Sequence, residues 1–412
     1  MKKINRFELE NGLRVVHCED RSVSMVVVNT LYDVGSKDEV REKTGFAHLF
    51  EHLMFGGTPN VPVFDEPVQL AGGDNNAWTC VDYTNYYITI PSNNLEVALW
   101  LEADRMTELD FSQRALDVQK NVVCEEFKQR CLNQPYGDLY HHLRKLCFEG
   151  HPYGWPTIGL KLEHIEKATS EEVRNFFYSH YAPNNAILSV VGNVSLEETR
   201  RLVQKWFGNI PRRDVIKRMI PKLEVQKTPR YLEVEKDVPT SLFYRVYHTG
   251  GRLTNDYFVS DFVSDVLSNG KSSRIHQELV KKKKIFTAAD AYISGDIEEG
   301  LFYFFGQFAK GTTPQLANEA FDEVIHDFLH TEITDYEVQK LRNKHESKHL
   351  SDCVAQADLA AELAYYELLG NAQMFNEQVN CYNQVTPVEA KDFAERVFQK
   401  ENSCTLFYKS KE

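Results

Sequence analysis

Three residues within one short segment have the types and the spacing needed to bind and use a metal ion. His48, Glu51 and His52 lie at positions i, i+3 and i+4, so on a helix all three project from one face. Imidazoles one turn apart can both bind one Zn²⁺, at about 2.0–2.1 Å each. The glutamate beside them can take a proton from zinc-bound water, whose pKa the metal lowers to about 7. The segment therefore predicts a hydrolytic zinc site with Glu51 as general base.

The same pattern can also arise by chance on a charged helix, because the motif is short. Here, however, the neighbouring residues are strongly apolar and include Leu49, Phe50, Leu53 and Phe55. Imidazoles and a carboxylate buried among such neighbours without partners would cost free energy. A functional role for the polar residues is therefore the better interpretation.

The third metal ligand must come from another segment, because a catalytic zinc needs three protein ligands and one open position. Glu126 is our candidate, since Val122 and Val123 share its helical face and indicate that it points inward. Glu125 is the rival, and the pattern alone does not separate the two. A purely structural zinc site is a further alternative, but it would want four protein ligands and no adjacent base.

Strand-like and helix-like segments alternate along the chain. Apolar, β-branched runs predict strands at residues 13–18, 25–34 and 83–91. A helix at 44–55, ended by two glycines, carries the histidines, and longer helices are predicted at 95–109 and 112–132. In the second half we predict strands at 242–248, 287–294 and 301–308 and helices at 257–267, 314–330 and 335–350.

A basic segment with three prolines at residues 211–229 reads as a linker. We therefore predict an N-terminal zinc-binding catalytic domain at 1–210 and a homologous non-catalytic C-terminal domain at 230–412. The tetrapeptides DVQK at 117–120 and EVQK at 337–340 occupy similar places in the two halves and suggest an internal duplication. The expected fold is α+β, with two α/β-sandwich domains in tandem, each a mixed, antiparallel-rich sheet packed with helices.

Composition narrows the class of protein. The chain has 412 residues, of which 42% are apolar, enough for two cores. Its net charge of −13 opposes binding to nucleic acid. No apolar run approaches the roughly 20 residues that span a bilayer, so we expect no membrane partner, and the N-terminus lacks the pattern of a signal peptide. The eight cysteines form no CxxC pair, which indicates thiols in a reducing, cytoplasmic compartment.

Beyond the zinc helix, four segments resemble the pitrilysin/insulinase family of zinc peptidases, the inverzincins with the inverted motif H-x-x-E-H. They are GGDNNAWT at 72–79, VVCEE at 122–126, HPYG at 151–154 and YAPNNA at 181–186. The resemblance covers nearly the whole chain and is closest to a bacterial branch of half-length chains, similar to mitochondrial processing peptidase subunits. It implies a zinc metalloendopeptidase with one Zn²⁺ per chain.

Carried over residue by residue, the resemblance makes His48 and His52 metal ligands and Glu51 the base. The family's third ligand closes a Val-Val-x-x-Glu pattern, which ends here at Glu126. The family often has a further glutamate seven residues earlier, where this chain has Gln119, so an auxiliary role at that position is not expected.

In this family an Asn-Ala-x-Thr segment forms an edge strand that pairs with the substrate backbone. Asn76, Ala77 and Trp78 match this segment and are the expected substrate-binding residues. Binding by β-strand addition favours extended peptides and reads little of their sequence. The glycines before the segment also fit an ordinary turn into a strand.

The second half of the chain lacks residues that the family uses there. Val280 and Thr287 replace an arginine and a tyrosine that hold substrate and the oxyanion, and neither can do so. Asp261, Ser264 and Asp265 lie where a duplicated zinc motif would fall. The resemblance therefore implies the zinc-bearing subunit of a heterodimer, whose homologous partner supplies the arginine and tyrosine around a closed chamber. A homodimer and a non-catalytic scaffold subunit are the alternatives, and the intact zinc motif argues against the scaffold.

Overall fold

The computed structural model describes residues 1–411 of the chain. These residues form two compact units. The first comprises Met1–Arg130, Trp155–Met219 and His349–Glu377, and the second comprises Cys131–Gly154, Ile220–Lys348 and Gln378–Glu412. Each unit therefore includes one short segment from the other half of the chain. The predicted domain limits, 1–210 and 230–412, remain a prediction.

The first unit is built on a six-stranded sheet in the order β1-β2-β6-β3-β5-β4. β2 and β6 are parallel, whereas the other neighbouring strands are antiparallel. The strands are β1 (Ile4–Glu8), β2 (Arg14–Glu19), β3 (Met25–Tyr32), β4 (Asp74–Thr79), β5 (Thr84–Pro91) and β6 (Ala186–Gly192). β4 is an edge strand, so its outer backbone groups face no other strand of this sheet.

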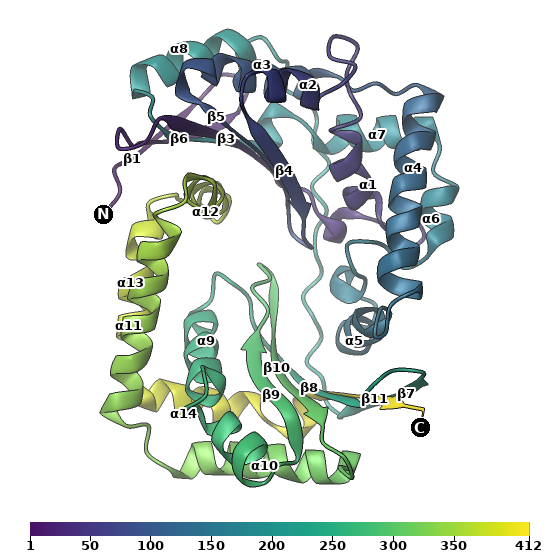
Figure 1. The fold of residues 1–412 in the computed structure, drawn as a ribbon, viewed down its shortest axis with the longest axis vertical. Coiled ribbons are helices and arrows are strands. Elements are labelled where there is room, and N and C mark those ends of the chain that lie inside the picture. Colours follow the sequence, from purple (N-terminus) through teal and green to yellow (C-terminus); the bar gives the residue numbers. More distant parts are fainter. Residues whose placement is uncertain (412) are drawn as a thin grey trace. The chain divides into compact units, whose positions relative to one another are not determined.

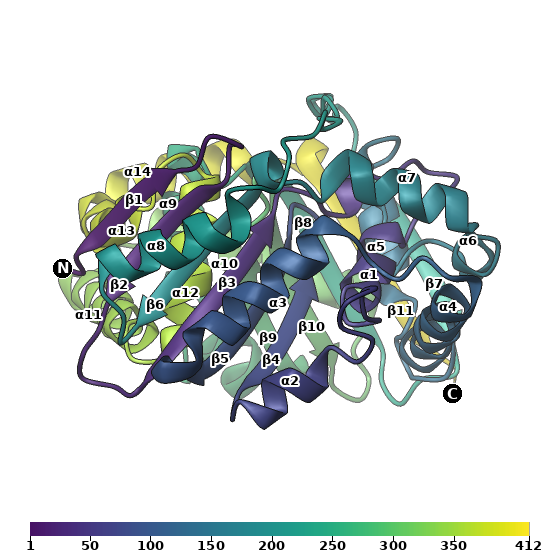
Figure 2. The same cartoon turned by 90° about the horizontal axis from the view of Figure 1, so that it is seen from above.

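Helices cover both faces of this sheet (Figures 1 and 2). On one face lie α3 (Leu95–Thr107) and α8 (Leu196–Phe207), which bury side chains such as Val28 and Ile88 in the main core. On the opposite face lies α12 (Gln356–Leu368), which packs against β6 and β3. The remaining helices of the unit are α1 (Phe46–Leu53), α2 (Asp65–Leu70), α4 (Gln113–Phe127), α6 (Leu162–Glu166) and α7 (Ser170–His180).

The second unit has a five-stranded sheet in the order β7-β11-β8-β10-β9. The strands are β7 (Arg230–Lys236), β8 (Leu242–Gly250), β9 (Phe286–Ile293), β10 (Glu299–Phe308) and β11 (Ser403–Ser410), and only β7 and β11 are parallel neighbours. This order and these directions repeat those of β2-β6-β3-β5-β4 in the first unit. The repeat agrees with the predicted internal duplication.

The helices of the second unit are α5 (Leu139–Cys147), α9 (Asn255–Ser268), α10 (Pro314–His330) and α14 (Pro387–Val397). Two more helices, α11 (Asp335–Asp352) and α13 (Met374–Gln384), contribute residues to both units. Across residues 1–411, no helix combines the length and the apolar character that crossing a membrane requires.

Candidate metal centre

Helix α1 positions the motif, and its local sequence explains where it begins. Gly45 precedes the helix with φ of 90°, a left-handed conformation that glycine adopts without strain. The buried carboxyl group of Glu39 accepts hydrogen bonds from the backbone N–H groups of Gly45 (2.9 Å) and Ala47 (2.8 Å). It thereby satisfies donors at the start of the helix, which otherwise have no partner within it. Leu49 and Phe50 are fully buried in the core, which fixes the direction of the polar face.

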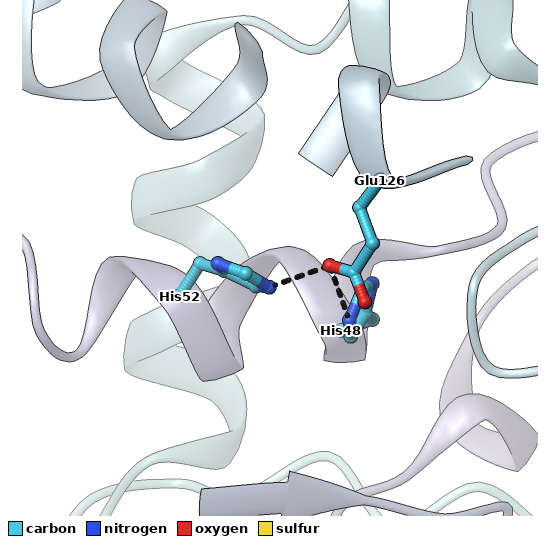
Figure 3. A group of neighbouring side chains, drawn as sticks. All are labelled: His48, His52 and Glu126. Carbon is cyan, nitrogen blue, oxygen red and sulfur yellow. Dashed lines mark ion pairs between the residues drawn. The ribbon is translucent and has the colours of Figure 1, made fainter. Parts of the chain in front are cut away.

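The polar face of α1 meets the end of α4, and three side chains converge there (Figure 3). The Nε2 atoms of His48 and His52 lie 3.5 and 3.1 Å from Oε2 of Glu126. The ligand atoms of the three residues all lie within 4.8 Å of one another, and among residues 1–411 no other group of histidine, cysteine and acidic residues meets this criterion. Ligands about 2.0–2.1 Å from a tetrahedral ion are separated by about 3.3 Å. The observed spacings therefore fit one zinc ion between the three side chains.

The electrostatics of the group also fit a cation. Burial lowers the pKa of His48 to about 4, so its imidazole is neutral and its nitrogen lone pair can bind a metal. The hydrogen bond with His52 lowers the pKa of Glu126, which favours the carboxylate. Within the described part of the chain, the buried Nδ1 of His48 has no hydrogen-bond partner. Two imidazoles and a carboxylate are the protein donor set of known catalytic zinc sites.

The structure separates the neighbouring glutamates that spacing alone left unresolved. Glu126 points toward the histidines, and its second oxygen, Oε1, pairs with Arg130 at 2.8 Å. The side chain of Glu125 is 63% exposed and pairs with Lys128 at 2.7 Å. Glu126 is therefore the glutamate placed to act as third ligand.

Glu51 lies on the same helix beside this group but is not part of it. Burial raises the pKa of its carboxyl, and the nearby Thr79 hydroxyl partly offsets this rise. Thr79 ends the edge strand β4, which packs against α1. A carboxylate with a raised pKa next to a metal position and a free strand edge has the properties of a general base.

Asn76, Ala77 and Trp78 lie in β4, as the resemblance implied. Ala77 packs against the core, whereas Asn76 and Trp78 point to the opposite face because strand side chains alternate. The Ala77 N–H donates to Asn76 Oδ1 at 2.8 Å, so the side chain of the strand itself occupies one backbone donor. The strand at this position was expected from the resemblance and not from a run of β-branched residues, because Asp, Asn and Gly are depleted in strands.

In the second half, the positions where the family has its arginine, its tyrosine and a duplicated zinc motif are occupied by residues with other surroundings. Val280 lies in a helical turn and Thr287 is exposed in β9. On α9, Asp265 pairs with Lys344 (2.5 Å) and with His345 (3.1 Å), and Asp261 accepts a hydrogen bond from the Tyr382 hydroxyl (2.6 Å). Other side chains of the second unit thus pair with these carboxylates.

Sequence reasoning missed two parts of the site. Glu39, which caps α1, precedes the motif by nine positions and belongs to no recognised capping pattern. The second is α12, which supplies Asp358 and Glu362 beside the face of β5 that carries Tyr87. The alternation of residues in β5 could have indicated the exposure of Tyr87, but no local signal pairs a helix at residue 360 with this sheet.

The tandem α+β units and the His-x-x-Glu-His helix together define a class, that of zinc peptidases with the inverted motif. Residues 14–159 match the family described as insulinase, peptidase family M16, and residues 167–344 match the peptidase M16 inactive domain. The chain belongs to peptidase family M16, the insulinase/pitrilysin family. The predicted family and the predicted fold class are both confirmed.

Individual relatives agree with this assignment. The zinc protease PqqE of Helicobacter pylori is 30% identical over 97% of this chain and 91% of its own. The uncharacterized zinc protease YmxG of Bacillus subtilis is 25% identical over 98% of both chains. A crystal structure of a protease from Helicobacter pylori superimposes with a TM-score of 0.92 at 29% identity, covering 99% of this chain and all of that one.

Proposed function

We propose that this chain is a zinc metalloendopeptidase that hydrolyses peptides or unfolded segments. The observation that carries the proposal is the convergence of His48, His52 and Glu126 at the separations expected of three zinc ligands. Glu51 lies on the same helix, one turn after His48. The names of the relatives, which are zinc proteases, support a peptidase. The zinc stoichiometry that we propose is one ion per chain, held by these three residues.

Glu51 is the proposed general base. A zinc ion held by the three ligands supplies Lewis-acid chemistry toward a water molecule and the scissile carbonyl. The Glu51 carboxylate accepts the proton of the attacking water and returns it to the leaving amine nitrogen. Its raised pKa suits both transfers, because a base poised nearer neutral pH can also act as an acid.

Substrate binding is proposed at the edge strand β4. An extended peptide that adds to this edge binds along Asn76, Ala77 and Trp78, and forms backbone hydrogen bonds only with the alternate residues whose N–H and C=O groups point away from β5. To do so it displaces the Asn76 side chain from the Ala77 N–H. Because Thr79 follows directly and lies beside Glu51, this register brings a backbone carbonyl of the peptide toward the metal position.

The proposed assembly is a heterodimer, in which a homologous subunit supplies the arginine and tyrosine that Val280 and Thr287 cannot replace. The two chains would enclose a chamber that admits peptides and excludes folded proteins. A homodimer is the alternative. We also propose a cytoplasmic location, in keeping with the cysteine pattern.

The test is Glu51→Gln in the full-length chain. We expect unchanged zinc content, measured by elemental analysis, and loss of cleavage of a mixed peptide pool followed by mass spectrometry. The unaltered chain is assayed with and without a chelator, both alone and with a co-expressed homologue from the same genome. Full activity of the purified chain alone would count against the heterodimer.

The same experiment separates the second candidate, a non-catalytic scaffold subunit of a processing-peptidase-like complex. The match of residues 167–344 to a domain described as inactive is the observation that keeps this candidate open. A scaffold would show no chelator-sensitive cleavage under any of these conditions, with or without Glu51.

A further inference from the structure

The face of β4 and β5 that points away from the main core carries a cluster of aromatic rings. Trp78 and Tyr87 lie on neighbouring strands with ring centroids 6.2 Å apart. Tyr83, just before β5, lies 5.4 Å from the ring of Tyr365 on α12. All four side chains are partly exposed rather than buried. The cluster therefore presents aromatic surface to solvent directly beside the edge strand.

Carboxylates surround these rings. Asp74 on β4 and Asp358 on α12 are both exposed, and both act electrostatically on the Tyr87 hydroxyl. Glu362, one turn further along α12, acts in the same way on Tyr83. Burial is the first cause of the raised pKa values of the two tyrosines, and these carboxylates add to it. The rings thus lie in a region of negative potential built from two separate elements.

The path of α12 explains why this surface is open. The helix packs most extensively on β6 and β3 and only marginally on β5, so it leaves the β5–β4 end of the sheet uncovered. Its buried side, with Leu359 and Leu363, faces the sheet, while Asp358 and Glu362 precede these residues and lie at the border of the open surface. Aromatic side chains of the sheet therefore form the base of the open surface, and the carboxylates of α12 lie along one side of it.

We propose that this surface, formed by Trp78 and Tyr87 with Asp358 and Glu362, is a subsite that selects a lysine or arginine side chain of a peptide bound along β4. The inference rests on the proposed function and deepens it by naming the substrate class. A strand added to β4 places alternate side chains on this face, next to Trp78. A lysine or arginine side chain next to Trp78 lies against aromatic rings and close to carboxylates, and both attractions favour its binding. Since Trp78 adjoins Thr79, the selected residue lies within a few positions of the bond that faces Glu51.

The experiment measures binding without turnover. The full-length chain with Glu51→Gln and bound zinc is titrated into a fluorescent, unstructured decapeptide of Gly, Ser and Ala. One position at a time carries lysine, arginine, norleucine or glutamate, and fluorescence anisotropy reports Kd. We expect one register at which lysine and arginine bind about five- to tenfold more tightly than norleucine, with glutamate weakest. Equal affinity for lysine and norleucine at every position overturns the proposal.

Variants assign the preference to this surface. Asp358→Asn with Glu362→Gln should remove most of the preference for a basic residue, and Trp78→Leu should reduce it, whereas Trp78→Phe keeps an aromatic ring and should retain part of it. Glu171→Gln with Glu197→Gln changes the net charge equally at exposed sites on α7 and α8 and should change nothing. A full preference for lysine in the Asp358/Glu362 double variant overturns the proposal.

The outcomes distinguish this inference from the proposed function. Retained binding with a lysine preference, but no cleavage of the same peptides by the chain with Glu51, whether alone or with the co-expressed homologue, counts against the peptidase and supports the subsite. Cleavage without any preference for a basic residue supports the peptidase and overturns the subsite. Absence of binding by any peptide overturns both. Circular dichroism and thermal melting of each variant verify that the fold is retained.

Discussion

Glu39 Oε1 accepts a hydrogen bond from the backbone N–H of Ala47 at 2.8 Å, one residue before His48. Glu39 is only 2% exposed, and burial raises the pKa of its carboxyl to about 8, although the N–H groups of Ala47 and Gly45 oppose the rise. The start of the histidine-bearing helix is therefore coupled to a titratable group that lies outside the motif.

The first prediction concerns the pH dependence of stability. Because the pKa of Glu39 is raised in the folded state, its contribution to stability is complete below the ordinary value of 4.5 and is lost as the pH rises to about 8. Glu39→Gln resembles the protonated carboxyl, so the variant should lose less stability than the parent between about pH 5 and 8. Urea unfolding across this range measures the difference in slope. The exposed Glu171→Gln serves as the control, and equal slopes for Glu39→Gln and the parent would refute the prediction.

The second prediction separates the neighbouring glutamates of α4. Glu126→Gln removes a carboxylate that lies against both histidines, so zinc affinity should fall by more than about a hundredfold. Glu125→Gln changes only an exposed pair with Lys128 and should leave the affinity within about twofold. Competition with a chromophoric chelator measures both affinities. A large loss of zinc affinity in the Glu125 variant, with normal affinity in the Glu126 variant, would show that Glu125 is the third ligand.

The motif itself was predictable because the spacing of His48, Glu51 and His52 has meaning only on a helix, and the structure has that helix. The choice between Glu125 and Glu126 needed more than spacing. Adjacent residues on a helix point about 100° apart, and which direction is inward depends on what packs against α4. The structure supplies that information, whereas the local pattern does not.

The strands and long helices that β-branched runs and helical periodicity predicted lie within a few residues of the observed bounds, whereas β1, β7 and β11 were not predicted. The placement of α12 on the first sheet was not predictable either. An apolar stripe such as that of Leu359 and Leu363 shows that a helix must be covered, but it does not identify the surface that covers it. The aromatic and acidic surface beside β4 depends on this long-range packing, which is why no sequence pattern revealed it.

The third prediction concerns a fully buried ion pair near the end of α3. Glu102 and Arg105 are both 0% exposed, and the guanidinium lies 4.6 Å from the ring centroids of Phe64 and Tyr86. Glu102→Gln leaves the buried cation without its counter-charge and should destabilise the fold by about 3–5 kcal/mol. Chemical denaturation measures the change.

Two further variants serve as controls for this pair. Glu102→Gln combined with Arg105→Met removes both charges, so most of the lost stability should return. Glu96→Gln disrupts an exposed pair with Lys205 and should cost less than about 1 kcal/mol. A double variant no more stable than Glu102→Gln alone would show that packing of the guanidinium against the rings, rather than the charge, dominates.

The fourth prediction tests whether the segment at residues 349–377 is part of the first unit's fold. Leu363 is fully buried on the side of α12 that faces β6 and β3, and Glu367 forms two hydrogen bonds with Arg6 of β1, at 2.6 and 2.7 Å. Leu363→Ala should therefore destabilise the protein by about 2–5 kcal/mol, because it leaves a cavity against the sheet. Leu350→Ala, at a residue that is 62% exposed, is the matched control and should cost less than about 0.5 kcal/mol. Hydrogen exchange measured by mass spectrometry should show faster exchange in β3 and β6 of the Leu363 variant. If faster exchange were confined to residues 349–377, α12 would be a loosely docked helix on which the sheet does not depend.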